Sequence, residues 1–297
     1  MKTSGPATPA LQRSPMRIRA TEVARQQARS ARAWRRALVP GGVGALPEFL
    51  IIGGMRCGTT SLYQYLAAHP EIEPALGKEL NYFSLHYGRS LRWYRGHFPR
   101  RAPGRLSFEA SPYYLFHPEA PHNVAETLPD VKLVVLLRDP IERAYSHYLH
   151  TRRRGFEPLS FAAALDAEAE RLHGGRAGYG GSQDPTRLYS YASRGEYAEQ
   201  LERWLDLFPR ERLHAIRSED LFSQPEMALD GLVDFLGVAR IGVEAFDRYA
   251  STPEEATPQL TRALRARLSE HFAPHNQRLA ELLGWSETWP LEAPSQR

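Results

Sequence analysis

The sequence predicts an α/β fold in a single domain, with a phosphate-loop-like parallel β-sheet flanked by helices. Strand-like and helix-like segments alternate along the chain, which is the pattern of a parallel sheet built from strand–helix–strand units. Two apolar runs, at residues 49–52 and 132–137, are short and continuous, as expected of strands buried on both faces. Each run leads directly into a turn and a helix start, so both mark strand-to-helix connections.

The remaining elements follow in order between helix-breaking residues. The first strand leads into a helix at residues 60–68, which ends before Pro70. The strand at residues 132–137 leads into a helix that starts at Pro140, with Asp139 as its N-cap. Further strands are expected at residues 106–110 and 212–216, further helices within residues 91–99, 117–128, 161–172, 197–207, 225–236 and 259–283, and irregular structure at residues 72–78.

The composition is ordinary for a soluble globular protein, with 42% hydrophobic and 24% charged residues in a chain of 297. The single cysteine, Cys57, excludes an internal disulfide. No apolar run reaches the length of a membrane span, and the N-terminus lacks the apolar core of a secretory signal. We therefore expect a cytoplasmic protein without a transmembrane segment.

Positive charge is concentrated near the N-terminus. Residues 1–40 hold nine Lys or Arg and one acid, Glu22, although the whole chain has a net charge of only +4. We expect residues 1–45 to be a basic, flexible extension and linker, residues 46–290 to be the globular domain, and residues 291–297 to be a tail. The extension could make a weak contact with an anionic membrane surface, but no nucleic-acid partner is expected.

The segment that follows the first strand has the composition of an anion-binding loop. Gly53 and Gly58 are spaced as in the phosphate loop G-x-x-x-x-G, in which backbone N–H groups converge on a phosphate. Thr59 stands where a nucleotide triphosphatase has its lysine, and the positive charge comes instead from Arg56 inside the loop. These features indicate a site for one phosphate group without magnesium. The alternative is a glycine turn that only lets the helix pack closely on the sheet.

A second candidate phosphate site follows the strand at residues 132–137. Arg138 comes directly after that strand, and Arg56 follows the first one, so both can reach the carboxyl edge of the sheet, where ligands bind. Two arginine sites suit a ligand with phosphates at opposite ends, such as a bisphosphorylated nucleotide. Ser146, two helical turns after Arg138, could hydrogen-bond the same distal phosphate. A salt bridge or helix cap at Arg138-Asp139 is the alternative explanation.

Several segments occur together in an order that is typical of one enzyme family. They are residues 53–62, 78–83 (K-E-L-N-Y-F), 93–99, 109–114 (E-A-S-P-Y-Y), 138–146, 195–205 and 235–237. On these segments the chain resembles the sulfotransferases that use 3′-phosphoadenosine-5′-phosphosulfate (PAPS), most of all the heparan-sulfate-type and bacterial members. The resemblance spans residues 47–285.

The resemblance implies a role for each residue of the two phosphate sites. Arg138 and Ser146 would hold the 3′-phosphate, and Glu79 would be the general base that takes a proton from the acceptor hydroxyl or amine. Arg56 stands where many members have lysine, and it would stabilise the charge on the departing phosphate. The residues that would bind the 5′-phosphosulfate are Arg56, Cys57, Gly58, Thr59, Thr60 and Ser61. PAPS is then the co-substrate, and the acceptor is a carbohydrate or a small natural product.

Two positions depart from the heparan-sulfate-type pattern. Asn81 stands where those enzymes have histidine, and Ala110 stands where they often have lysine. Both positions lie near the acceptor in those enzymes, so the resemblance does not identify the acceptor. Aromatic residues that could stack on an acceptor, or belong to the core, are Tyr82, Phe83, Trp93, Tyr113 and Tyr114.

Two other functions stay open at this point. A P-loop nucleotide kinase or triphosphatase would need a lysine after Gly58 and an acid that holds magnesium, and Thr59 argues against it. A non-catalytic nucleotide-binding module would use the same loop without turnover. No group of His, Cys and Asp has the spacing of metal ligands, so no metal is predicted. The prediction is a PAPS-dependent sulfotransferase of bacterial type.

Overall fold

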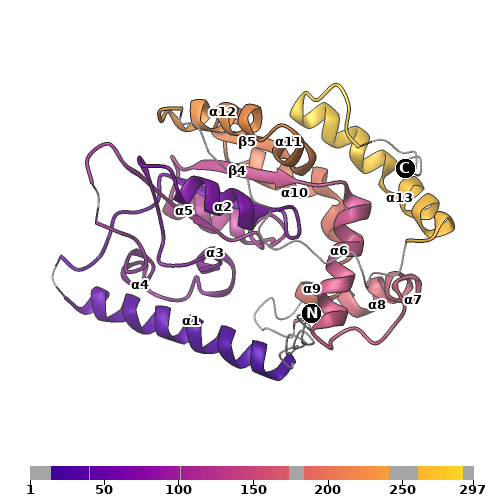
Figure 1. Cartoon of the computed structure of the whole chain (residues 1–297), viewed down its shortest axis with the longest axis horizontal. Coiled ribbons are helices and arrows are strands. Elements are labelled where there is room, and N and C mark those ends of the chain that lie inside the picture. Colours follow the sequence, from indigo (N-terminus) through magenta and orange to yellow (C-terminus); the bar gives the residue numbers. More distant parts are fainter. Residues whose placement is uncertain (1–14, 40, 101, 174–183, 241–259, 290–297) are drawn as a thin grey trace, which may run out of the picture.

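A parallel sheet forms the centre of the molecule (Figure 1). The computed structural model describes residues 15–39, 41–100, 102–173, 184–240 and 260–289. Its five strands are ordered β2-β3-β1-β4-β5, and every pairing is parallel. The strands are β1 (Phe49–Gly53), β2 (Ile72–Pro74), β3 (Leu106–Ala110), β4 (Lys132–Leu137) and β5 (Leu213–Arg217). The predicted α/β fold with a parallel sheet is confirmed.

The strand order reverses at β1. The chain places β3 on one side of β1 and then β4 on the other side. At such a reversal the connections leave toward opposite faces of the sheet, which opens a crevice beyond the carboxyl ends of the strands. The segments after β1 and β4 therefore lie where an α/β sheet binds its ligand.

Helices cover both faces of the sheet. Ile51 of β1 packs with Leu62 of α2 on one face, whereas Ile52 packs with Trp204 of α10 on the other. Residues of β1 and β4 are buried on both sides, which explains their continuous apolar runs. The first face carries α2 (Thr59–Ala67), α11 (Ser218–Ser223) and α12 (Pro225–Leu236), and the second carries α5 (Ala120–Thr127), α10 (Tyr197–Leu205) and α13 (Arg262–Leu283).

A smaller core surrounds α6 (Pro140–Arg153) at one end of the molecule (Figure 1). Tyr148 of α6 packs against Phe161 and Tyr191, and Phe272 of α13 completes the cluster. The short helices around it are α7 (Phe161–Asp166), α8 (Glu168–His173), α9 (Pro185–Leu188) and the 3-10 turn η1 (Ser193–Gly195), and a second 3-10 turn, η2 (Arg210–Arg212), precedes β5. Because α6 starts just after β4 ends, its first turn lies at the carboxyl edge of the sheet.

Two local predictions differ from the structure. Residues 72–78 are predicted to be irregular, but Ile72–Pro74 form β2, a strand too short to show an alternating pattern. The helix predicted at residues 161–172 is two helices. Glu168 lies at the break, where it is buried, and its carboxylate accepts a hydrogen bond from the N–H group of Ala192.

A basic helix, α1 (Pro15–Leu38), runs along the side of the domain and packs on α4 (Leu91–Arg95) (Figure 1). Ala33 is fully buried, and a Cβ on Gly96 would lie 2.5 Å from the Ala33 carbonyl oxygen. Arg92 of α4 donates a hydrogen bond to the carbonyl oxygen of Ala37. The basic extension therefore includes a helix that contacts the domain.

The domain limits stay a prediction. The first 14 residues of the extension and the tail at residues 291–297 lie outside the described residues. Across the ranges that the structure describes, no helix combines the length and the apolar character needed to cross a bilayer.

Candidate active site

The loop after β1 turns the chain into α2 through two residues of positive φ. Arg56 has a φ of 70° and Gly58 has a φ of 87°. Gly58 is the N-cap of α2 and makes no side-chain hydrogen bond to the N–H groups of the first turn. The start of α2, with the positive end of its helix dipole, is therefore suited to bind an anion. This is the strand–turn–helix geometry that the sequence predicts.

Gly58→Ala is expected to destabilise the protein. A Cβ at Gly58 would lie 2.8 Å from the ring of Phe222, and its left-handed φ strains any L side chain. We expect the free energy of unfolding, measured by urea denaturation, to fall by about 1–3 kcal/mol. Gly104→Ala is the matched control, since its φ is +74° but a Cβ there meets nothing within 4 Å. Equal losses in the two variants would show that close packing at Gly58 contributes nothing.

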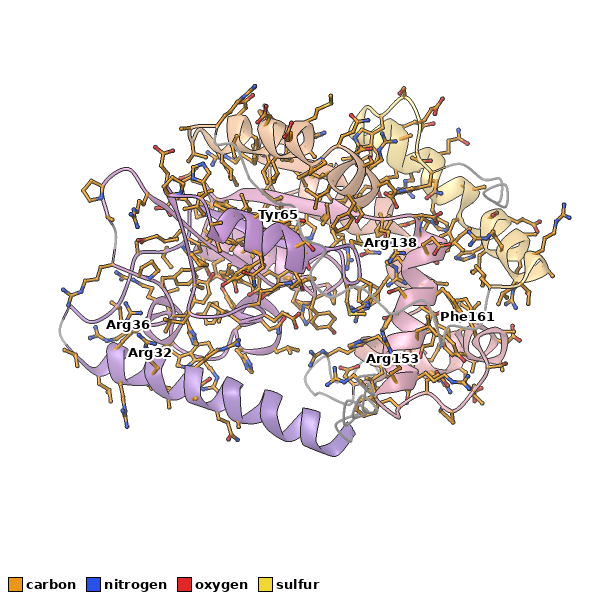
Figure 2. The ribbon with its side chains drawn as sticks, viewed as in Figure 1. Arg32, Arg36, Tyr65, Arg138, Arg153 and Phe161 are labelled. Atoms are coloured by element: carbon orange, nitrogen blue, oxygen red, sulfur yellow. The ribbon has the colours of Figure 1, made fainter. Side chains whose placement is uncertain are left out.

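The structure brings three predicted residues together. Arg56 Nε donates a hydrogen bond to Ser146 Oγ at 3.1 Å, and Arg138 Nη1 donates to the Arg56 carbonyl oxygen at 3.5 Å. Burial, followed by the positive charges of Arg153 and Arg138, lowers the pKa of Arg56. Figure 2 shows Arg138 near the start of α6 and Arg153 toward its other end. Positive charge therefore gathers between the loop and α6, and a bound anion would relieve the repulsion.

Arg138 is held on several sides. The Tyr197 hydroxyl donates to its carbonyl oxygen at 2.9 Å. Its guanidinium lies 3.7 Å from Glu142, which also pairs with Arg265 of α13 at 2.5 Å. Asp139 is the N-cap of α6 and accepts hydrogen bonds from two N–H groups of the first turn. Asp139 is thus a helix cap, and the ion pair of Arg138 is made with Glu142.

A lysine reaches the loop from another segment. Lys78 Nζ donates hydrogen bonds to Thr59 Oγ1 at 3.2 Å and to Thr60 Oγ1 at 2.9 Å. Burial lowers the pKa of Lys78 to about 8. The ammonium group therefore lies beside position 59, where a nucleotide triphosphatase has the lysine of its loop. The sequence places Lys78 in a family motif but indicates no role for it, because only the fold brings it to the loop.

Glu79 lies exposed on a turn directly after Lys78. It has a φ of 59° and Asn81 has a φ of 51°, so two residues other than glycine adopt the left-handed conformation. The Glu79 N–H donates to the Ala110 carbonyl oxygen at 2.8 Å, and Asn81 Nδ2 donates to the Glu79 carbonyl oxygen at 3.0 Å. Such residues cost on the order of 1–3 kcal/mol each and are common at active sites. The surrounding hydrogen bonds hold the turn in this conformation.

A buried carboxylate supports the turn from the interior. Glu109 accepts hydrogen bonds from Tyr94 at 3.0 Å, from Tyr114 at 2.7 Å and from Ser111 at 3.2 Å. Burial raises the pKa of Glu109 to about 7. Ser111 Oγ in turn accepts a hydrogen bond from the N–H group of Asn81 at 3.0 Å. The turn is therefore tied to the core, a role that the sequence did not indicate for Glu109.

Helix α1 also contacts this turn. Arg29 Nη1 donates to the Lys78 carbonyl oxygen at 3.4 Å. A Cβ on Gly77 would lie 2.4 Å from the same guanidinium nitrogen, so the side chain of Arg29 packs closely over the glycine. The basic extension therefore helps to position the backbone next to Lys78 and Glu79.

Several candidate side chains are enclosed by the protein. Cys57 and Ser61 are fully buried, so neither residue presents atoms to solvent beside the loop. Burial raises the pKa of Cys57 to about 11, which makes it an unreactive thiol. Asn81 and Ala110 are buried as well. The aromatic residues considered as stacking surfaces belong to the core, since all five are buried: Tyr82, Phe83, Trp93, Tyr113 and Tyr114.

Comparison with known proteins identifies the family of the chain. The family model described as the sulfotransferase domain matches residues 46–254, which is more than half of the chain. Human heparan sulfate glucosamine 3-O-sulfotransferase 6 is 29% identical over 269 residues, or 82% of this chain and 73% of that protein. Human heparan sulfate glucosamine 3-O-sulfotransferase 3A1 is also 29% identical, over 85% of this chain and 64% of that protein.

A solved structure shares the fold. The sulfotransferase from Alicyclobacillus acidocaldarius superimposes with a TM-score of 0.70 at 30% identity, and the match covers 82% of this chain and 98% of that one. Sequence motifs, fold and relatives agree. The chain belongs to the sulfotransferase domain family.

Proposed function

We propose that the chain transfers the sulfuryl group of PAPS to a hydroxyl or amine of a carbohydrate or small natural-product acceptor. The observation that carries the proposal is the convergence of Lys78, Arg56 and the N-terminus of α2 at the loop after β1. A helix N-terminus with two cationic side chains is suited to a phosphate linked to a second anionic group. Family membership argues for a sulfuryl donor there and against the kinase alternative.

The two ends of the donor would be held by different elements. The loop and Lys78 would bind the 5′-phosphosulfate end, and Arg138 with Ser146 would bind the 3′-phosphate. The donor would fit this site through its negative charges. Burial and the neighbouring positive charges of Arg153 and Arg138 lower the pKa of Arg56, so an anion beside Arg56 would favour its charged form. A ligand with two separated anionic groups would stabilise all of these cations.

The transfer would proceed by in-line displacement at sulfur. The acceptor oxygen or nitrogen forms the new bond to sulfur, and the bond from sulfur to the bridging phosphate oxygen breaks, with its electron pair moving to that oxygen. Lys78 and Arg56 would stabilise the charge that develops on the phosphate. Glu79 would take the proton of the acceptor, and its exposed position on the turn leaves it accessible. No step of this reaction requires a metal ion.

A carbohydrate is the acceptor class that the relatives favour. The human relatives are named for heparan sulfate glucosamine. Asn81 and Ala110 occupy two acceptor-side positions of the heparan-sulfate-type pattern, and both are buried here. We therefore propose that the acceptor is bound by other residues than in those enzymes. The cytoplasmic location and the bacterial type stay predictions.

Arg138→Ala is expected to weaken the binding of adenosine 3′,5′-bisphosphate by roughly 10–100-fold, because a charged hydrogen bond to the 3′-phosphate is lost. Calorimetric titration measures the change. Adenosine 5′-phosphate serves as the control ligand, since it lacks the 3′-phosphate, and its affinity should be nearly the same for both proteins. Equal weakening for both nucleotides would mean that Arg138 does not read the 3′-phosphate.

Transfer itself is tested with purified chain, radiolabelled PAPS and a panel of acceptors. The panel contains N-sulfated and N-acetylated glucosamine oligosaccharides, simple phenols and amino sugars. Labelled product from at least one acceptor, lost in Glu79→Gln, is the expected result. Donor binding without transfer to any acceptor, including slow transfer to water, would favour the non-catalytic nucleotide-binding alternative.

A further inference from the structure

Two histidines and a glutamate form a cluster on α13 and α10. His271 and His275 are four residues apart on α13, so both project from one face of the helix. Glu196 is the N-cap residue of α10, the helix that packs against α13. One potential ligand atom from each of these three residues lies within 4.8 Å of the other two. Donor groups from two separate elements therefore converge on one point.

Carboxylates contact both imidazole rings. His271 Nε2 lies 3.1 Å from Glu196 Oε1, and His275 Nδ1 lies 2.9 Å from Glu199 Oε1. The other carboxylate oxygen of Glu199, Oε2, is buried and has no hydrogen-bond partner within the described ranges. Leaving a buried acceptor unsatisfied is unfavourable. The cluster thus contains more acceptor capacity than the protein itself satisfies.

Packing between the two helices fixes the position of the cluster. Leu279 of α13 shares a core with Leu201 and Trp204 of α10. Phe272 lies so close to Gly195 that a Cβ there would be 2.8 Å from its ring. Phe272 follows His271 on α13, and Gly195 directly precedes Glu196 at the start of α10. The donors are therefore held by the core, which is what a preorganised ion site requires.

We propose that Glu196, His271 and His275 bind a divalent transition-metal ion, best matched by zinc, which fastens α13 to α10. Zinc takes imidazole nitrogen and carboxylate oxygen at about 2.0–2.2 Å, which places tetrahedral ligand atoms about 3.4 Å apart. The three ligand atoms lie within 4.8 Å of one another, and side-chain rotations would have to close the remaining difference. Glu199 orients His275, as an outer carboxylate does for a metal-bound histidine.

The three donor groups match zinc better than they match magnesium or calcium. Magnesium and calcium prefer oxygen ligands, whereas two of the three donors here are imidazole nitrogens. The His271 side chain is 41% exposed, so an ion can enter and water can complete its coordination. The site stands apart from the proposed transfer reaction, and its link to that reaction is structural, since α13 also carries Arg265, which pairs with Glu142 beside Arg138.

The competing account is a pair of ion pairs between protonated histidines and glutamates. Glu196 raises the pKa of His271, and the charges of Glu168 and Arg267 act on the same ring. Arg278 lies 3.9 Å from Glu199 and adds positive charge on the other side. The ion pair between His271 and Glu196 is present at low pH and is lost as the pH rises through the raised pKa of His271. Zinc binding has the opposite dependence, because its ligands must lose their protons.

The test is titration of the chelator-stripped full chain with zinc chloride, followed by calorimetry at pH 7.5 and at pH 5.5. We expect one equivalent to bind at pH 7.5 with micromolar or tighter affinity, with little effect of millimolar magnesium. Affinity should fall strongly at pH 5.5, and cobalt should give the visible absorption of a four-coordinate ion. The melting temperature should rise with zinc concentration.

Matched variants identify the ligands. His271→Ala and Glu196→Gln are expected to abolish the bound equivalent, and Glu199→Gln is expected to weaken it by about 10–100-fold. His122→Ala, an exposed histidine on α5, is the control and should bind zinc normally. Glu196→Gln changes no packing volume, so it keeps the test valid if His271→Ala unfolds. Absence of zinc binding, or binding that persists in both Glu196→Gln and His271→Ala, would overturn the proposal.

Discussion

Glu79→Gln is expected to lower kcat by about 10²–10⁴-fold, the range for removal of a positioned general base. Glutamine keeps the size of the side chain but cannot accept the acceptor proton. The backbone should tolerate the change, because the turn is held by main-chain contacts to Ala110 and Asn81 rather than by the carboxylate. Steady-state rates of sulfate transfer measure the effect, and the affinity for adenosine 3′,5′-bisphosphate should not change.

Glu226→Gln is the matched control for Glu79. Glu226 is an exposed acid in the first turn of α12, and its loss should leave both rate and donor affinity unchanged. If Glu79→Gln turned over at the normal rate with donor bound normally, Glu79 would not be the base. A large loss of donor affinity in the variant would instead assign Glu79 to the shape of the donor site.

Lys78→Met is expected to lower kcat by about 10²–10³-fold, the loss seen when one preorganised donor to a developing anion is removed. Methionine fills the space of the lysine stem but carries no charge. The hydrogen bonds from Lys78 Nζ to Thr59 and Thr60 place the ammonium at the loop that would bind the departing phosphate. Rates with saturating PAPS separate this effect from weaker donor binding.

Lysine and arginine at position 78 should differ in their dependence on pH. The pKa of Lys78 is lowered from 10.5 to about 8 by burial, so the free enzyme loses this charge above pH 8. We expect kcat/KM to fall above that pH, and Lys78→Arg, which keeps its charge, to remove this alkaline limb. An unchanged alkaline limb in Lys78→Arg would assign that limb to another group.

The lowered pKa of Lys78 also affects the stability of the fold. From pH 8 to 10.5 the unfolded chain binds this proton more tightly than the folded protein does, so the contribution of Lys78 to stability rises with pH.

The sequence was sufficient where the structure depends on local pattern. The apolar runs of β1 and β4, the glycines of the loop and Pro140 at the start of α6 all determine the backbone within a few residues. Because parallel strands end at one edge of the sheet, Arg56 and Arg138 could be placed near each other from the order of elements alone. The structure adds the direct contact between Arg56 and Ser146.

The sequence was insufficient where contacts join distant segments. Lys78 follows an irregular stretch, and nothing in its neighbourhood indicates that it reaches Thr60. The left-handed φ of Glu79 could not be predicted, because the residue is not a glycine. Its backbone is held by hydrogen bonds with Ala110 and Asn81.

The histidine cluster was missed for a related reason. Glu196 lies 75 residues before His271, so only helix packing brings the two together. One signal was present, because His271 and His275 have the four-residue spacing of a helical ligand pair. The prediction of no metal rested on the spacing of possible ligands along the chain. Such spacing does not include a ligand from a distant segment that the fold brings to a histidine pair.

Calorimetric titration of the purified chain with adenosine 3′,5′-bisphosphate, beside ATP and without magnesium, tests the central claim most directly. The bisphosphate carries both phosphates of the proposed donor but no sulfuryl group, so its affinity reports the site without turnover. We expect one equivalent of the bisphosphate to bind tightly and ATP to bind much more weakly. A preference for ATP, or no binding of either nucleotide, would contradict a PAPS-dependent sulfotransferase.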